Sequence, residues 1–79
     1  MLRTLVKTDA LAVADQSYDV RYFEVRTLRG ARRYSAEILL SPSDRIILDD
    51  DSMTNLEART ARLVPATLLS RMITRVPAA

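Results

Sequence analysis

The chain has 79 residues, of which 48% are hydrophobic and 28% are charged, and its formal net charge is +2. This length fits one small domain, and the balance of apolar and charged residues is typical of a globular protein rather than a disordered one. Cysteine and histidine are both absent, which excludes disulfide bonds and the usual zinc sites. A small domain that lacks both often gains stability by forming oligomers.

The composition also argues against catalysis. General acid–base chemistry usually employs histidine, and the common catalytic triads need histidine beside a serine or cysteine. The single glycine, Gly30, excludes phosphate-binding loops and dinucleotide motifs, which require several glycines. We therefore expect a protein that is not an enzyme and holds neither a cofactor nor a metal ion.

The sequence contains no segment suited to a membrane. No apolar run approaches the roughly 20 residues that a spanning helix needs. The short apolar stretch at residues 10–14 lies between Asp9 and Asp15, and these acidic residues argue against a signal peptide. We expect a cytoplasmic protein.

Residues 1–17 carry no decisive pattern. Their apolar residues suit a strand or an irregular arm, and Asp9 is an acceptable cap for one or two helical turns. A helix this short would not persist alone. We interpret the segment as an N-terminal arm that covers a sheet edge or pairs with a partner chain. Residues 18–76 then form a single α+β domain.

Two turn signals divide the next stretch into three strands. Gly30 suits the first position of a two-residue type II′ turn, which needs a positive φ. Pro42, between two serines, suits a type I turn. The sequence predicts a three-stranded antiparallel meander with strands near 19–28, 33–40 and 45–49.

The proposed turns also predict the register of the strands. A loop at Gly30 and Ala31 places Phe23 opposite Ile38 and Val25 opposite Ala36, and the second turn places Ile47 beside Ile38. We expect the helical part of the chain to pack on this face. The second face then carries a second apolar group, which we interpret as an interface between two copies of the chain: Tyr22, Leu39, Ile46 and Leu48.

The C-terminal third has the periodicity of a helix. Its apolar positions recur at intervals of three and four residues, and they continue to the end of the chain as Leu68, Leu69, Met72, Ile73 and Val76. Ser52 or Asp51 is the expected N-cap. Because proline breaks or bends helices, we expect either two helices, 52–63 and 65–75, or one helix kinked at Pro65.

Two charged clusters suggest binding sites. Three aspartates precede the first helix, but consecutive side chains do not converge on one point, so we assign them to capping and solvation rather than to a metal ion. The arginines around the first turn are candidate nucleic-acid contacts: Arg26, Arg29, Arg32 and Arg33. A solvated turn is favoured, because nucleic-acid-binding domains usually carry a larger basic excess.

The segment 45–75 resembles a ribbon-helix-helix repressor in its order of strand, acidic cap, helix, break and helix. The resemblance rests on Arg45-Ile46-Ile47-Leu48-Asp49-Asp50, Leu56-Glu57 and Thr67-Leu68-Leu69-Ser70-Arg71. It implies a strand that pairs across a dimer and reads the major groove of DNA. The glycine usual between the helices is missing, with Pro65 nearby instead, and the upstream hairpin already offers the strand a partner.

Taken together, these patterns predict a small non-catalytic interaction module of bacterial type that forms a homodimer through the second sheet face. The identity of any protein partner is not encoded in a recognisable motif. The alternative is a DNA-binding transcriptional regulator.

Overall fold

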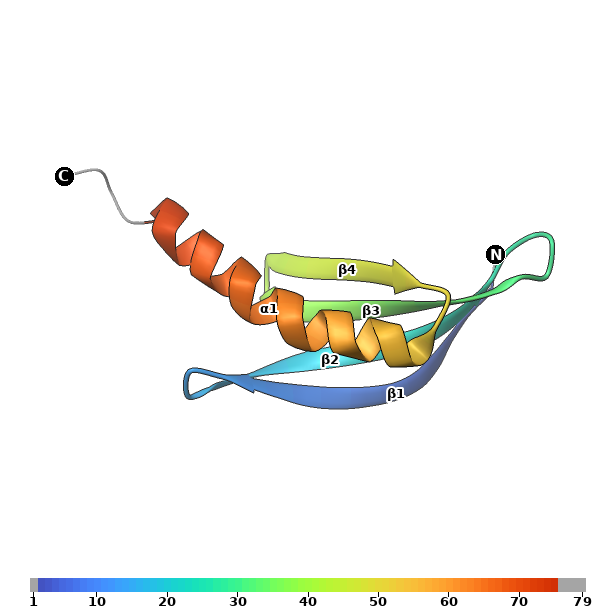
Figure 1. Ribbon diagram of the computed structural model, residues 1–79, viewed down its shortest axis with the longest axis horizontal. Coiled ribbons are helices and arrows are strands. Elements are labelled where there is room, and N and C mark those ends of the chain that lie inside the picture. The colour runs from blue at the N-terminus through green and yellow to red at the C-terminus, as the bar shows by residue number, and fades with distance from the viewer. Residues whose placement is uncertain (1, 76–79) are drawn as a thin grey trace.

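The computed structural model describes the backbone of residues 2–75 and the side chains of residues 2–71. Its elements in chain order are β1 (Leu2–Val13), β2 (Gln16–Arg26), β3 (Arg32–Ser41), β4 (Asp44–Asp50) and α1 (Met53–Arg75). The four strands form one antiparallel sheet in the order β1-β2-β3-β4 (Figure 1). The expected α+β class is confirmed, with one strand more and one helix fewer than the two-helix prediction.

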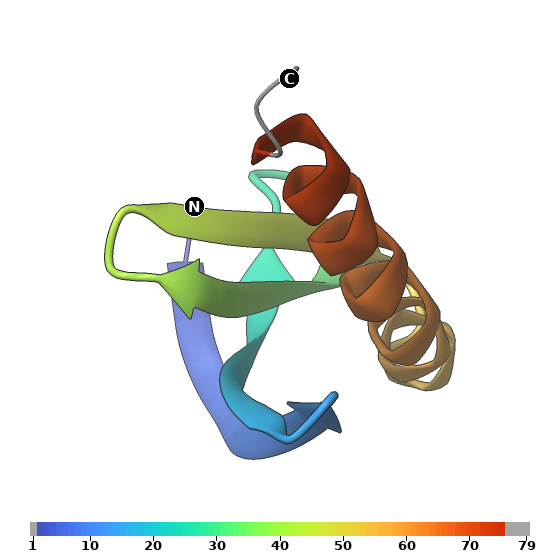
Figure 2. The ribbon, with the colours of Figure 1, turned by 90° about the vertical axis from the view of Figure 1, so that its left-hand side faces the viewer.

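The helix covers one face of the sheet (Figure 2). It packs chiefly on β3 and β4, and its buried residues Leu56, Thr60 and Val64 follow one another at intervals of four. This spacing places them on a single stripe of the helix. The stripe meets a cluster of buried residues on the sheet, namely Val20, Tyr22, Ala36 and Ile38.

The expected N-terminal arm contains a strand of the sheet. β1 pairs with β2 along almost its whole length, from Leu2 opposite Arg26 to Val13 opposite Gln16. The turn between them is Ala14-Asp15, where φ is 49° and 67°. Two-residue hairpins of this kind usually contain glycine or asparagine. A turn without either gave no signal in the sequence, so β1 was missed.

The register of the β2–β3 hairpin differs from the predicted one. Gly30 has the expected positive φ of 81°, but five residues rather than two connect the strands. The Gly30 N–H donates to the Thr27 carbonyl at 2.9 Å, and the Ala31 N–H donates to the Thr27 hydroxyl at 3.1 Å. The loop therefore closes at Thr27 and shifts the pairing by three residues, which exchanges the two faces of β2 relative to β3.

The pairing of β3 with β4 is displaced by one residue. The turn at Pro42 is where the sequence predicts it, but a bulge at Leu40 places Ile46, and not Ile47, opposite Ile38. The prediction that Phe23, Val25 and Ile47 face the helix is therefore wrong. Val20, Tyr22 and Ile46 occupy that face instead.

The start of α1 follows the sequence prediction. The Ser52 hydroxyl accepts a hydrogen bond from the Asn55 N–H at 3.3 Å, so Ser52 is the N-cap. The Asp50 carboxylate accepts the Ser52 N–H at 3.0 Å. Arg59 then joins α1 to β4, because it donates to the Asp49 carbonyl at 2.6 Å and to the Asp50 carboxylate at 3.1 Å.

Pro65 lies inside one continuous helix, so the prediction of two helices is wrong. Proline removes one helical hydrogen bond, but buried Val64 and half-buried Leu68 pack on either side of it. The ribbon-helix-helix arrangement is also not observed, since β4 pairs with β3 of the same chain and one helix follows. Of the predicted apolar stripe, Met72, Ile73 and Val76 lie outside the described side chains.

The strained turn generates a stability prediction. Ala14→Gly is expected to raise the free energy of unfolding by up to about 1 kcal/mol, because a left-handed conformation costs a non-glycine residue about 1–2 kcal/mol. Urea unfolding measures the change. The control Ala12→Gly, within β1, is expected to lower stability by roughly 0.5–1 kcal/mol. A loss of stability in both variants would contradict the turn geometry.

The Asp50 carboxylate, which precedes the helix, makes the stability of the fold depend on pH. The hydrogen bond from the Ser52 N–H, aided by Arg59, lowers the pKa of Asp50 below its ordinary value of 3.8. A carboxylate with a lowered pKa stabilises the fold above its ordinary pKa and loses that contribution as the pH falls through its folded pKa. Asp50→Asn is therefore expected to be less stable than the wild type at neutral pH. The difference should shrink below about pH 4 in thermal unfolding curves, and a constant difference would contradict the linkage.

Candidate functional site

The face of the sheet away from α1 has no covering layer within the described residues. Three aliphatic side chains on this open face are about half exposed: Leu5 at 51%, Leu39 at 43% and Ile47 at 56%. On the same face Phe23 lies opposite Leu5, and Val25 lies two residues further along β2; both are partly buried. We call these five residues the open-face patch. Contiguous exposed apolar side chains on a folded protein commonly mark an interaction surface.

Three arginines converge on a single carboxylate at the centre of the open face. Glu37 lies within 3.5 Å of Arg3, 4.0 Å of Arg21 and 3.4 Å of Arg45. The Glu37 side chain is only 15% exposed, whereas the arginines reach outward from β1, β2 and β4. One carboxylate cannot neutralise three guanidinium groups, so the centre of the face carries surplus positive charge.

Two further contacts complete this surface. The guanidinium of Arg3 lies 3.7 Å from the centre of the Phe23 ring, a cation–π arrangement that covers the aromatic face. Arg33, opposite Val25, adds a fourth arginine. A hollow of about 450 Å³ lies between Arg3, Val25, Arg33 and Ile47. Asp19 and Asp49 are the other carboxylates of this face.

The predicted interface residues do not lie together. Tyr22 is 4% exposed beneath α1, and burial raises the pKa of its phenol. Ile46 and Leu48 also pack toward the core under the helix. Leu39 alone lies on the open face, where it is paired with Arg45. The register shift accounts for this exchange.

The predicted nucleic-acid contacts are also divided. Arg26 and Arg32 both contact Glu24, at 3.4 Å and 3.2 Å, on the helix side of the sheet. Arg29 is exposed in the turn, and Arg33 belongs to the open face. The four arginines therefore do not form one basic patch.

The acidic run before the helix alternates between the two faces of the sheet. Asp50 accepts the N–H of the capping residue Ser52 and binds Arg59, while Asp49 lies on the open face. No group of three or more potential metal ligands is present among the residues that the structure describes. The same residues include no helix that is both long and apolar enough to cross a membrane.

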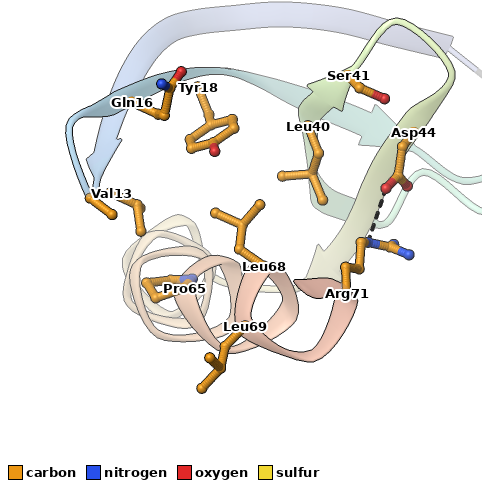
Figure 3. A pocket seen from close by; sticks show the side chains of 11 residues that line it. Val13, Gln16, Tyr18, Leu40, Ser41, Asp44, Pro65, Leu68, Leu69 and Arg71 are labelled. Carbon is orange, nitrogen blue, oxygen red and sulfur yellow. Dashed lines mark ion pairs between the residues drawn. The ribbon is translucent and has the colours of Figure 1, made fainter. Parts of the chain in front are cut away.

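A groove of about 520 Å³ lies between the C-terminal half of α1, the β1–β2 turn and the β3–β4 turn. Tyr18, Leu40 and Leu68 point into it, whereas Leu69 points away (Figure 3). An ion pair of 3.0 Å between Arg71 and Asp44 forms one wall. These walls offer apolar packing and one neutralised ion pair, and no arrangement of groups for catalysis. No sequence pattern predicts this groove, because one of its walls is the unpredicted β1–β2 turn.

Comparison with known proteins identifies no relative: no family, no curated protein and no solved structure matches this chain significantly. The functional argument therefore rests on the geometry of the surfaces.

The arginine cluster generates a third prediction. Glu37→Gln removes a carboxylate that lies within 4.0 Å of three arginines, and we expect it to lower stability by about 1 kcal/mol at low salt. The loss should diminish toward about 1 M salt, where charges are screened within about 3 Å. Denaturant unfolding at both salt concentrations measures this. Asp19→Asn, on the same face but without an ion pair among the described residues, is the control, and an equal loss in that variant would contradict the assignment.

Proposed function

We propose that the protein is a non-catalytic interaction module whose open sheet face binds an acidic, partly apolar segment of another protein. The observation that carries this proposal is the combination of the open-face patch with the arginine cluster around Glu37. Leu5, Leu39 and Ile47 supply exposed apolar area. Arg3, Arg21 and Arg45 supply charge for which Glu37 is the shared partner.

The charge of this face disfavours its packing against a second copy of itself. Two such faces would bring two arginine clusters together, and like charges across an interface cost several kcal/mol in order of magnitude. A partner that carries carboxylates among apolar side chains complements a face on which arginines stand among apolar side chains. Arginine suits such carboxylates, because guanidinium forms paired hydrogen bonds with them.

A protein partner suits the face better than a nucleic acid does. Single-stranded nucleic acid is usually held by aromatic side chains on which bases stack. The one phenylalanine of this face already has Arg3 against its ring at 3.7 Å. The exposed side chains are aliphatic instead, and aliphatic groups pack against other aliphatic groups.

Three labelled probes test the proposal by fluorescence anisotropy: a peptide of alternating leucine and glutamate, the same peptide with lysine for glutamate, and a thymidine oligonucleotide. The acidic peptide is expected to bind, and the lysine peptide is not. Preference for the oligonucleotide would assign the face to nucleic acid. Failure of the acidic peptide to bind below about 1 mM would refute the proposal.

Variants of the face sharpen this test. Arg45→Gln removes one positive charge and is expected to weaken binding of the acidic peptide about threefold to tenfold, in line with about 1 kcal/mol for an exposed ion pair. Glu37→Gln removes the competing carboxylate and is expected to strengthen it. Leu69→Ser, at an exposed position of α1, is the control and should leave binding unchanged.

A further inference from the structure

The outer edge of β1 is an open sheet edge with backbone groups available for pairing. In a two-residue hairpin the residues flanking the turn form a hydrogen-bonded pair, and the pattern then alternates along the strand. Val13, Leu11, Asp9 and Lys7 therefore direct their backbone groups toward β2. Thr8, Ala10 and Ala12 direct theirs outward.

One hydrogen bond supports this assignment independently. The Ala10 N–H donates to the Asp9 carboxylate of the same chain at 2.9 Å. A backbone donor already engaged with β2 would not need this bond. The edge is thus unpaired at Ala10, and a neighbouring side chain satisfies the donor in the free protein.

The edge of β1 also has little protection. It contains no proline, its side chains from Leu2 to Ala10 are all exposed, and α1 packs chiefly on β3 and β4. Lys7 of this strand pairs with Glu57 of the helix at 3.0 Å, and Leu11 and Val13 pack against the core; these contacts lie on the face rather than at the edge. A bulge at Val6 limits regular pairing at one end, whereas the segment from Lys7 to Val13 pairs with β2 without a further shift.

We propose that a second copy of the chain pairs with this edge, β1 against β1 in antiparallel orientation, with a two-fold axis through Thr8. The outward backbone groups of Thr8 in the two copies then bond to each other. Thr8 faces its own equivalent, a favourable pairing across strands. The two sheets become one sheet of eight strands.

Charge selects this register over its neighbours. With the axis at Thr8, Lys7 of each copy lies opposite Asp9 of the other, so two pairs of opposite charge form. An axis at Lys7 would place lysine opposite lysine, and an axis at Asp9 would place aspartate opposite aspartate. Directly opposed like charges destabilise a strand pair. Two copies of the segment Lys7-Thr8-Asp9 are therefore complementary in charge when they pair in antiparallel orientation.

The existing contacts are compatible with this pairing. Lys7 keeps its bond to Glu57, because the ammonium group has three donors and one contact of 3.0 Å uses one of them. Asp9 exchanges its bond to the Ala10 N–H for the lysine of the second copy. This pairing uses the edge of the sheet and not the open face, so it stands independently of the proposed acidic partner.

A charge exchange tests the register. Asp9→Lys places lysine opposite lysine in its own dimer, and Lys7→Asp places aspartate opposite aspartate. Each variant alone is expected to dimerise at least tenfold more weakly than the wild type in analytical ultracentrifugation. A mixture of the two is expected to form a heterodimer, because each lysine then lies opposite an aspartate. The mixture also shows that a variant is folded, whatever the effect of Lys7→Asp on the contact with Glu57.

Thr8→Pro tests the backbone pairing. It removes an outward N–H that β2 does not use, and proline is tolerated on the free side of an edge strand. Circular dichroism confirms the fold, and the dimer should be lost. In the wild type, the amides of Thr8 and Ala10 should gain protection from hydrogen exchange as the protein concentration rises.

The inference would be overturned by a wild type that stays monomeric up to about 1 mM. It would equally be overturned by a dimer that neither Asp9→Lys nor Thr8→Pro weakens. Binding of the acidic peptide by a monomeric wild type would sustain the proposed function while excluding this interface. The β1–β1 dimer and the binding of an acidic segment can therefore be refuted independently of each other.

Discussion

The packing of one helix on one face of a four-stranded sheet is the constraint from which the other features follow. A helix with its side chains is about 10–12 Å across, whereas four strands at about 4.8 Å spacing span about 19 Å. The helix lies over β3 and β4, where Leu56, Thr60 and Val64 meet Val20, Ala36 and Ile38. One face of the sheet and the edge of β1 are consequently left uncovered.

The sequence predicts the turns and the start of the helix better than it predicts the register of the strands. Gly30, Pro42 and Ser52 each act by local chemistry, through a positive φ, a preset turn and a side-chain cap. Register depends on how many residues the loop contains. In the β2–β3 hairpin the register is set by the Thr27 side chain, which accepts a hydrogen bond from the Ala31 N–H. No turn motif in the sequence predicts this bond.

The error in register explains the errors in the predicted site. The existence of a second, uncovered apolar face follows from the sequence, because both faces of the central strands carry large apolar residues. Which residues form that face does not follow from the sequence. A shift of three residues moved Tyr22 into the core and Phe23 onto the open face. The same shift places Glu37 opposite Arg21.

The sequence did not decide between a strand and an irregular arm at β1, and the reason is different. Its turn is made of alanine and aspartate, and the alanines that precede it, Ala10 and Ala12, are better helix formers than strand formers. Only the pairing with β2 makes this segment a strand. Arg3 joins the cluster around Glu37 through that pairing, so no sequence argument restricted to the meander could include it.

The two exposed surfaces differ in the symmetry of their charges. The open face gathers three arginines around the single carboxylate of Glu37, and two such clusters would repel each other. The β1 edge alternates in sign about Thr8 and is complementary to its own copy. If two copies join at β1, both helices lie on the same side of the extended sheet, and the two open faces become neighbours. A partner with two acidic segments would then gain from binding both at once.

The helix also contacts both ends of β4, the opposite edge strand of the sheet. Arg59 holds the Asp49 carbonyl at one end of β4, and Arg71 holds Asp44 at the other. A sheet with two edges available for pairing adds copies at both and grows into a fibre, whereas a sheet with one such edge stops at a dimer. The two arginines of the helix therefore place charged side chains at both ends of this edge, an arrangement that opposes pairing between sheet edges.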